Sequence, residues 1–231
     1  MQIRNGIESI EMMAIFKFFV VAILLFALIC LALALDSSRL QSALVGKYGA
    51  GAMTSFNAWQ SMMEAVKEKS PEDKLKRVNE FFNRRITWAE DQKIWGQVDF
   101  WATPIDTIGK GMGDCEDFAI AKYYTLLNLG VPIERLRLVY VKSRNGNGTS
   151  GGEQAHMVMA YYQTPDTEPL ILDNMITDMR PASRRPDLSP VFSFNSEGIY
   201  SGIAGQDGKS ENTKLSKWQD LLQRAQTEGF N

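Results

Sequence analysis

The stretch GKGMGDCEDFAIAKYYTLLNLG, residues 109–130, constrains the fold more than any other part of the chain. Alternating glycines break regular structure at its start, and Asp114 is a favourable residue for a helix N-cap. Apolar residues then recur at helical spacing until Gly130 and Pro132 end the run. The pattern predicts a largely buried helix with Cys115 in its first turn.

The thiol of Cys115 is subject to opposing electrostatic influences. The free N–H groups and the positive dipole end of a helix N-terminus favour a thiolate. The neighbouring carboxylates of Asp114, Glu116 and Asp117 oppose it, because like charges raise the pKa of a thiol unless they are neutralised. A cation bound by these three carboxylates would neutralise them. The alternative is that they form only an N-cap and a solvated helix face.

The N-terminal residues differ in character from the rest of the chain. After Lys17, an unbroken apolar run extends from Phe18 to Leu35 and contains Ala32-Leu33-Ala34, which has the small-x-small form of a signal-peptidase site. We expect residues 1–34 to be a signal peptide. An uncleaved membrane anchor is the alternative, since the run is close to the minimum length of a span. In either case the folded part is exported.

Residues 35–231 are predicted to form a single domain. The chain has 231 residues, of which 45% are hydrophobic, and no linker, charge block or repeat divides it. Its net charge is −2 and no Lys/Arg run lines a helix, which excludes nucleic acid as a partner. Because Cys30 lies in the export segment, Cys115 is the one thiol of the mature part and no internal disulfide can form.

Helices are expected before the Cys115 segment. Residues 38–68 have apolar residues at spacings of three and four, and Ser70-Pro71 is a start signal for a second amphipathic helix. The aromatic segment 86–104 is irregular and is expected to be a packed loop. Together with the strands described next, these segments predict an α+β fold.

Strand-like segments follow the Cys115 helix, at residues 135–144, 155–163 and 169–175. The second opens with His156, the only histidine of the chain, and the third ends shortly after Asp173. A symmetric hairpin would keep both side chains on one face but four residues out of register, which a bulge or a shorter loop would correct. The glycine-rich segment 143–154 is expected to be a mobile hairpin loop.

The three side chains have the chemistry of a thiol-protease site. A cysteine nucleophile, a histidine base and a carboxylate that orients the imidazole are its parts. A lone cysteine on an apolar helix face or a lone histidine in a strand is more often structural than functional. The combination, in the order helix with Cys115, strand with His156 and strand with Asp173, favours the catalytic interpretation.

The sequence also resembles a known family. The stretch FWATPIDTIGKGMGDCEDFAIAKYYTLLNLG, together with AHMVMAYY and LILDN, is closely similar to the bacterial transglutaminase-like cysteine proteinases of the LapG type. The resemblance covers about residues 75–180 with specific motifs. It implies a papain-like, transglutaminase-like core in which N-terminal helices pack on an antiparallel β-sheet and the nucleophile lies at a helix N-terminus.

The resemblance also implies roles for particular residues. Cys115 corresponds to the nucleophile, His156 to the base and Asp173 to the residue that orients the base. The cofactor that it implies is Ca²⁺, with the ligands Asp114, Glu116 and Asp117. A bound calcium ion would answer the electrostatic problem at the thiol, since an oxygen-ligated divalent cation offsets the carboxylates.

The biological role is implied by the resemblance alone. Enzymes of this type are periplasmic endopeptidases that cut large surface adhesins near a di-alanine site, which releases the adhesin and disperses biofilm. An inner-membrane receptor of the LapD type, which senses cyclic di-GMP, holds them inactive. We therefore expect a periplasmic location, an adhesin substrate and such a receptor as inhibitor. A narrow cleft lined by Trp95, Phe100 and Trp101 would suit an Ala-Ala site.

Two other functions are consistent with the same residues. One is a different thiol enzyme on this core, either a cell-wall peptidase or a transglutaminase, which the reaction product would distinguish. The other is a calcium-dependent binding module without catalysis. Alkylation of Cys115 by iodoacetamide near neutral pH would distinguish that module, because an inert buried thiol scarcely reacts.

Overall fold

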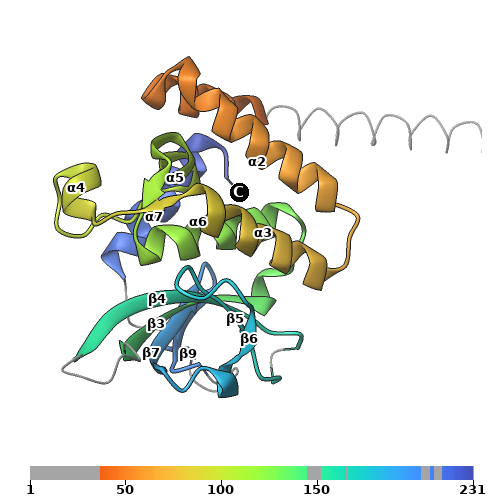
Figure 1. Cartoon of the computed structure of the whole chain (residues 1–231), viewed down its shortest axis with the longest axis vertical. Coiled ribbons are helices and arrows are strands. Elements are labelled where there is room, and N and C mark those ends of the chain that lie inside the picture. Colours follow the sequence, from red (N-terminus) through yellow and green to blue (C-terminus); the bar gives the residue numbers. More distant parts are fainter. Residues whose placement is uncertain (1–36, 145–151, 165, 204–208, 211–214, 231) are drawn as a thin grey trace, which may run out of the picture.

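The computed structural model describes residues 37–144, 152–164, 166–203, 209–210 and 215–230. The expected signal peptide and most of the glycine-rich loop lie outside these ranges. The described residues form a helical layer packed on one side of a curled antiparallel sheet (Figure 1). This arrangement confirms the predicted α+β fold. No helix within the described ranges is long and apolar enough to cross a membrane.

The helical layer starts with the helical residues 37–48. A 3-10 turn and further helices follow: η1 Ala50–Ala52, α2 Met53–Val66, α3 Pro71–Arg85, α4 Asp91–Trp95, α5 Pro104–Lys110, α6 Cys115–Asn128 and α7 Ser216–Glu228. The prediction that residues 38–68 are helical is confirmed for most of the segment, but the helix is not continuous, because Gly49 adopts a φ of 74° and interrupts it. The predicted start of α3 is confirmed, since the N–H of Asp73 donates to Ser70 Oγ at 3.2 Å.

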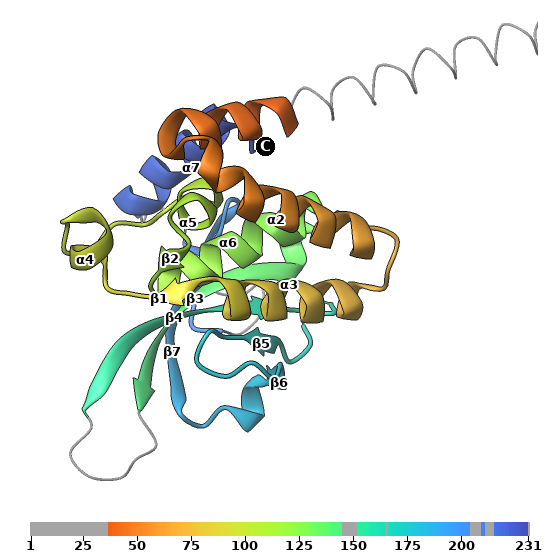
Figure 2. The ribbon, with the colours of Figure 1, turned by 45° about the horizontal axis from the view of Figure 1, so that its top comes forward.

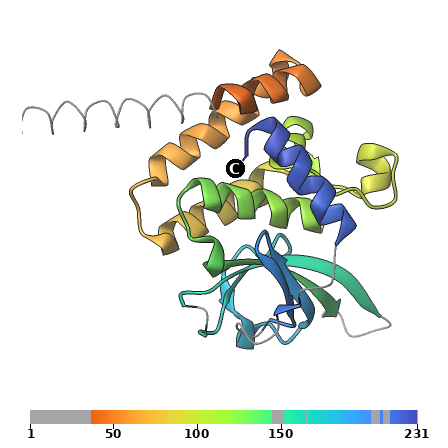
Figure 3. The same cartoon turned by 180° about the vertical axis from the view of Figure 1, so that it is seen from behind.

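The sheet has seven strands in the order β6-β5-β4-β3-β7-β8-β9, and all neighbouring strands are antiparallel. Their bounds are β3 Leu136–Arg144, β4 Glu153–Tyr161, β5 Leu170–Leu172, β6 Arg180–Pro181, β7 Leu188–Asn195, β8 Gly198–Ser201 and β9 Lys209–Ser210. Figure 3 shows from behind how the strands curve away from the helices. The three predicted strands are confirmed as β3, β4 and β5, although β5 ends before Asp173.

Both faces of the central strands are buried. On the helical face, alternate residues such as Leu138, Met157 and Met159 join the main core. Their neighbours Val139 and Val158 point into a second apolar cluster inside the curl of the sheet. Strands buried on both sides become nearly continuous apolar runs, which explains the composition of β3 and β4.

Helix α6 is the centre of the structure. It lies on β3 and β4, with α3 and α5 packed against its other sides (Figure 2). Trp59 of α2 donates a hydrogen bond of 2.9 Å to Thr125 Oγ1, and Trp218 of α7 packs edge-on against Tyr123 at 5.9 Å between ring centres. These neighbours hold the body of α6 on the sheet.

Candidate active site

A short parallel strand pair leads into the first turn of α6. Strand β1, Thr87–Trp88, pairs with β2, Met112–Gly113, so that Trp88 lies opposite Gly113. A Cβ atom at Gly113 would lie only 2.7 Å from the Cβ of Asp117. Glycine is therefore required there, and the backbone just before Cys115 is held close to the helix that follows.

The thiol of Cys115 faces β4 on one side and a carboxylate on the other. Its Sγ donates a hydrogen bond of 3.0 Å to Glu116 Oε2 and accepts one from the backbone N–H of Met157, the residue after His156. Burial, followed by the charge of Glu116, raises the pKa of the thiol well above its usual value. Without a compensating cation, the site therefore holds Cys115 as the neutral thiol.

His156 and Asp173 form a buried pair. Nε2 of His156 lies 2.9 Å from Oδ1 of Asp173, and the residues are 5% and 1% exposed. Met159 pairs with Leu172, which leaves Asp173 two residues from His156 instead of the four that a symmetric hairpin predicts. The turn between β4 and β5 therefore starts earlier than expected, after the pair Tyr161–Leu170, and Asp173 reaches His156 just beyond the last residue of β5.

The carboxylate of Asp173 is fully partnered. Its Oδ1 also accepts from the N–H of Met175 at 3.0 Å, and its Oδ2 accepts from Arg185 Nη2 at 2.7 Å. Burial alone would raise the pKa of Asp173, but hydrogen bonds and charge from His156, Met175 and Arg185 outweigh it and hold the pKa well below its usual range. Asp173 is therefore ionised, and its partner nitrogen Nε2 carries the proton. The other ring nitrogen, Nδ1, is left to exchange a proton with a thiol.

A cluster of acidic side chains surrounds the start of α6. Oxygens of Asp91, Asp114 and Asp117 lie within 4.8 Å of one another, and Asp114, Cys115 and Glu116 form an overlapping group. Asp114 occupies the N-cap position but its side chain makes no capping hydrogen bond, contrary to the sequence-based expectation. Its carboxylate is directed into this cluster instead.

The acidic cluster fits a cation. Asp91 Oδ1, Asp114 Oδ1 and Asp117 Oδ2 are buried and lack a hydrogen-bond partner within the described residues. Burial, then the charges of neighbouring carboxylates, raises the pKa of Asp114 to about 10, and burial raises the pKa of Asp91 to about 6. Buried carboxylate oxygens without donors are costly unless they bind a metal ion. Oxygen ligands of this kind suit calcium.

Comparison with known proteins identifies the family. Residues 54–186 match the sequence model of the bacterial transglutaminase-like cysteine proteinases. The chain belongs to this family. No match was found among curated proteins.

Solved structures of one family member are similar to this chain. Calcium-bound LapG of Legionella pneumophila is 38% identical, with a TM-score of 0.68 over 81% of this chain and 98% of that chain. EGTA-treated LapG of the same organism is 38% identical, with a TM-score of 0.69 over 81% and 96% of the two chains. These matches confirm the transglutaminase-like fold predicted from the sequence. They also show that a relative has been crystallised with calcium.

The aromatic segment 86–104 of this chain is packed, as expected from the sequence. Trp95 packs against Phe100 with ring centres 4.7 Å apart, and Trp101 stacks on Phe194 at 5.7 Å. The segment also contains α4, so it is not wholly a loop. These contacts show that the rings pack against other parts of the structure. Phe100 and Trp101 also line a surface cavity, to which Trp95 does not contribute.

Sequence reasoning missed two residues of the candidate site. Asp91 lies 24 positions before Cys115 in the aromatic segment, and no spacing rule connects the two. Arg185 lies beyond the third strand in a turn after η3, Ala182–Arg184. Its contact with Asp173 depends on how the chain turns back beside β5, which no local pattern reveals.

Proposed function

We propose that this protein is an exported, calcium-dependent cysteine endopeptidase with Cys115 as nucleophile, His156 as base and Asp173 as the carboxylate that orients the base. The observation that carries the proposal is the buried pair of His156 and Asp173, with Nε2 and Oδ1 2.9 Å apart. Beside it, the thiol of Cys115 accepts a hydrogen bond from the backbone N–H of Met157. Membership of a cysteine proteinase family supports the same chemistry. The order of these residues along the chain is the order expected from the sequence.

The proposed reaction has two covalent stages. Nδ1 of His156 takes the thiol proton, and Cys115 Sγ attacks the carbonyl carbon of the scissile peptide bond. The backbone N–H groups at the start of α6 and its dipole stabilise the oxyanion that forms. The imidazolium then gives its proton to the leaving amine. In the second stage His156 removes a proton from water, whose oxygen attacks the thioester and releases the acid and the free thiol.

The residues that would hold calcium are Asp91, Asp114, Glu116 and Asp117. When bound, the ion supplies positive charge that offsets these carboxylates. Glu116 then ceases to be the acceptor that keeps Cys115 protonated. Asp114 and Asp117, at the start of α6, hold the first turn in place, so that the thiol is aligned with His156.

The proposed substrate is the N-terminal region of a large surface adhesin, cut near a di-alanine site. Cleavage would release the adhesin and promote biofilm dispersal. The proposed location is the periplasm, with a cyclic di-GMP receptor of the LapD type in the inner membrane as inhibitor. Resemblance to LapG-type enzymes supports this role, and calcium-bound LapG is among the similar structures.

Incubation of residues 35–231 with adhesin N-terminal fragments tests the proposal. We expect two products whose summed mass exceeds the fragment by one water, formed with calcium and not with EGTA. Cys115→Ala is the matched control and should form neither product. Cross-linked species with loss of ammonia would indicate a transglutaminase instead. Cleavage retained by the alanine variant would contradict a cysteine nucleophile.

A further inference from the structure

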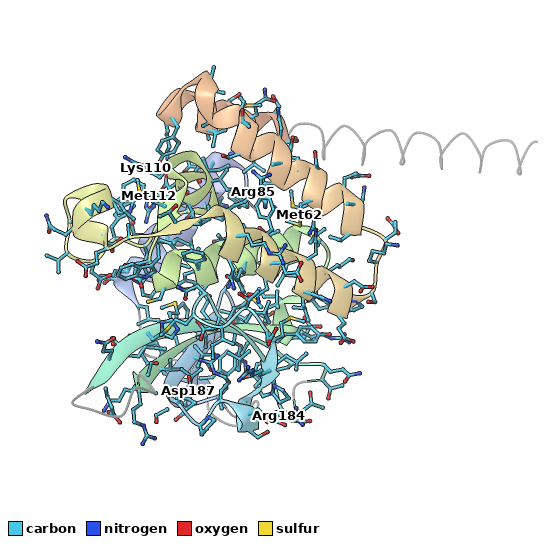
Figure 4. All side chains as sticks on the ribbon, viewed as in Figure 1. Met62, Arg85, Lys110, Met112, Arg184 and Asp187 are labelled. Carbon is cyan, nitrogen blue, oxygen red and sulfur yellow. The ribbon has the colours of Figure 1, made fainter. Side chains whose placement is uncertain are left out.

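Arg185 is a buried cation directly behind the histidine-carboxylate pair. It is 3% exposed and lies in the turn between η3 and β7. Its Nη2 donates to Asp173 Oδ2 at 2.7 Å and to Asp187 Oδ2 at 2.7 Å, while its Nε donates to Asp187 Oδ1 at 3.0 Å. Asp187 and the neighbouring Arg184 lie in the sheet layer, on the side away from the helices (Figure 4). A single guanidinium therefore links Asp173 to Asp187, the residue just before β7.

The two oxygens of Asp173 have separate tasks. Oδ1 accepts from His156, whereas Oδ2 is occupied by Arg185. The guanidinium is planar, so its donor nitrogens have fixed directions relative to one another. Because Nε and Nη2 both donate to Asp187, the direction of the remaining Nη2 hydrogen toward Asp173 is fixed as well. The Asp173 carboxylate cannot rotate without breaking a buried charged hydrogen bond.

We propose that Arg185, braced by Asp187, is a positioning residue that fixes the plane of the Asp173 carboxylate and thereby selects the His156 tautomer with the proton on Nε2. The proposal rests on the proposed function, because that tautomer is the one whose Nδ1 can accept the thiol proton. Arg185 acts through Asp173 and does not touch the reacting atoms. Its guanidinium also balances the charge of a carboxylate that would otherwise be buried beside a neutral imidazole.

Lys122 cannot replace Arg185 in this role. Its side chain is buried on α6 and interacts with Asp173 only through its charge, with Nζ 5.8 Å from the centre of the Phe118 ring. An ammonium that acts on Asp173 through charge alone contributes to the field there without fixing the orientation of the carboxylate. Orientation therefore depends on the hydrogen-bonded fork of Arg185.

The sole histidine of the chain allows a direct test. In full-length protein without a histidine tag, ¹⁵N-labelled histidine gives the signals of a single imidazole, His156. A Cys115→Ala background prevents any self-cleavage during the measurement. The measurement itself needs no substrate. We expect the parent to show mainly the Nε2–H tautomer at a pH where the ring is neutral. Arg185→Met should give a mixture of tautomers, and Arg185→Lys should lie between the two.

Arg184→Met is the matched control, because Arg184 is exposed and adjacent in sequence. It should leave the tautomer unchanged. If Arg185→Met does not fold, Asp187→Asn provides the test. Asp187 is half-buried, and the substitution weakens the ion pair that holds the guanidinium while Arg185 itself is retained. A partial shift toward the mixture supports the proposal. A folded Arg185→Met or Asp187→Asn with the parent tautomer pattern overturns it.

Kinetics give a second, independent readout in the Cys115 enzyme. Arg185→Met should lower kcat by about 10²-fold with KM changed by less than about threefold, since outer-shell partners of a catalytic group typically act at that scale. A role in stability alone would lower the melting temperature without moving the tautomer. If no peptidase activity exists in the parent, the proposed function fails, whereas the tautomer measurement still decides whether Arg185 orients the pair.

Discussion

The thiol of Cys115 donates a hydrogen bond of 3.0 Å to Oε2 of Glu116, its neighbour in the first turn of α6. This contact makes the nucleophile depend on the acidic cluster. A carboxylate that accepts a hydrogen bond from the thiol favours the neutral thiol, although the helix N-terminus favours the thiolate. Removing negative charge from Glu116 by a cation reverses the balance. The proposed metal site and the proposed nucleophile therefore form one electrostatic unit.

Asp91 should be necessary for calcium binding although it lies far from Cys115 in sequence. Its Oδ1 is buried without a partner beside Asp114 and Asp117. Asp91→Asn removes one charge from the ligand set, and we expect it to weaken calcium binding at least about tenfold. Isothermal titration measures the affinity directly. Asp178→Asn, at a carboxylate with 83% of its side chain exposed, is the control, and equal affinities in the two variants would exclude Asp91 as a ligand.

Gly113 should be intolerant of a side chain. A Cβ there meets the Cβ of Asp117 at 2.7 Å and its Oδ2 at 3.0 Å. Gly113→Ala should therefore lower the free energy of unfolding by about 1–3 kcal/mol and reduce the thermal shift produced by calcium, because Asp117 must move. Gly46→Ala is the control, since that helical glycine has nothing within 4 Å of an added Cβ. Equal calcium shifts in both variants would show that Asp117 need not stay in place.

His156 and Asp173 should affect the same step. His156→Ala should remove activity nearly as completely as loss of Cys115, because a catalytic pair acts as a unit. Asp173→Asn keeps the shape of the side chain but removes the charge that selects the tautomer, so kcat should fall by about 10²–10⁴-fold with a smaller change in KM. Steady-state kinetics on one cleaved fragment separates the two constants. Effects of His156→Ala on KM alone would contradict a shared site.

Lys122 should make the stability of the protein depend on pH. Burial lowers its pKa to about 7 in the folded state, whereas the unfolded lysine keeps a pKa near 10.5. Between these values the unfolded chain binds more protons at Lys122, so this residue contributes a stability that rises with pH, by at most about 1.4 kcal/mol per pH unit. Asp114 and Cys115, whose pKa values are raised in the folded state, contribute with the opposite sign, so the difference between the parent and a Lys122 variant isolates the lysine. Lys122→Met should be more stable than the parent, most of all at pH 7 and below, and should lose this slope. Denaturant unfolding from pH 7 to 10 measures it.

The exposed Lys76 provides the control for this measurement. Lys76→Met removes the same charge from the surface of α3 without changing a buried group. It should keep the slope of the parent. Equal pH slopes in the parent and in Lys122→Met would mean that the ammonium of Lys122 finds solvent or a partner in the folded state.

Patterns within one element were sufficient to predict much of this structure. The helical period and flanking glycines placed Cys115 at the start of α6, and alternation placed His156 on a strand. The α+β fold and the family followed from the same segments. The break at Gly49 was missed because the apolar spacing continues through it, although glycine in a helical run costs up to about 1 kcal/mol and warns of a break.

Contacts between distant elements were not predictable in the same way. Asp91 reaches the cluster because α4 folds back beside the start of α6, and Arg185 reaches Asp173 because the chain turns after η3. The offset between His156 and Asp173 depends on where the turn between β4 and β5 begins and on its length, which no strand pattern fixes. The side chain of Asp114, which was expected to cap α6, makes no capping hydrogen bond and belongs to the acidic cluster. Each of these features depends on tertiary packing that is set far from the residue itself.

The most direct test of the coupling between calcium and the nucleophile is the rate at which iodoacetamide alkylates Cys115. Residues 35–231 contain no other thiol, so the measurement needs neither substrate nor partner. Near pH 7 we expect alkylation in calcium to be at least about tenfold faster than in EGTA, because the bound cation offsets the carboxylates that keep the thiol protonated. Asp114→Asn should respond less to calcium than the parent. Equal rates in calcium and EGTA would contradict calcium activation of this thiol.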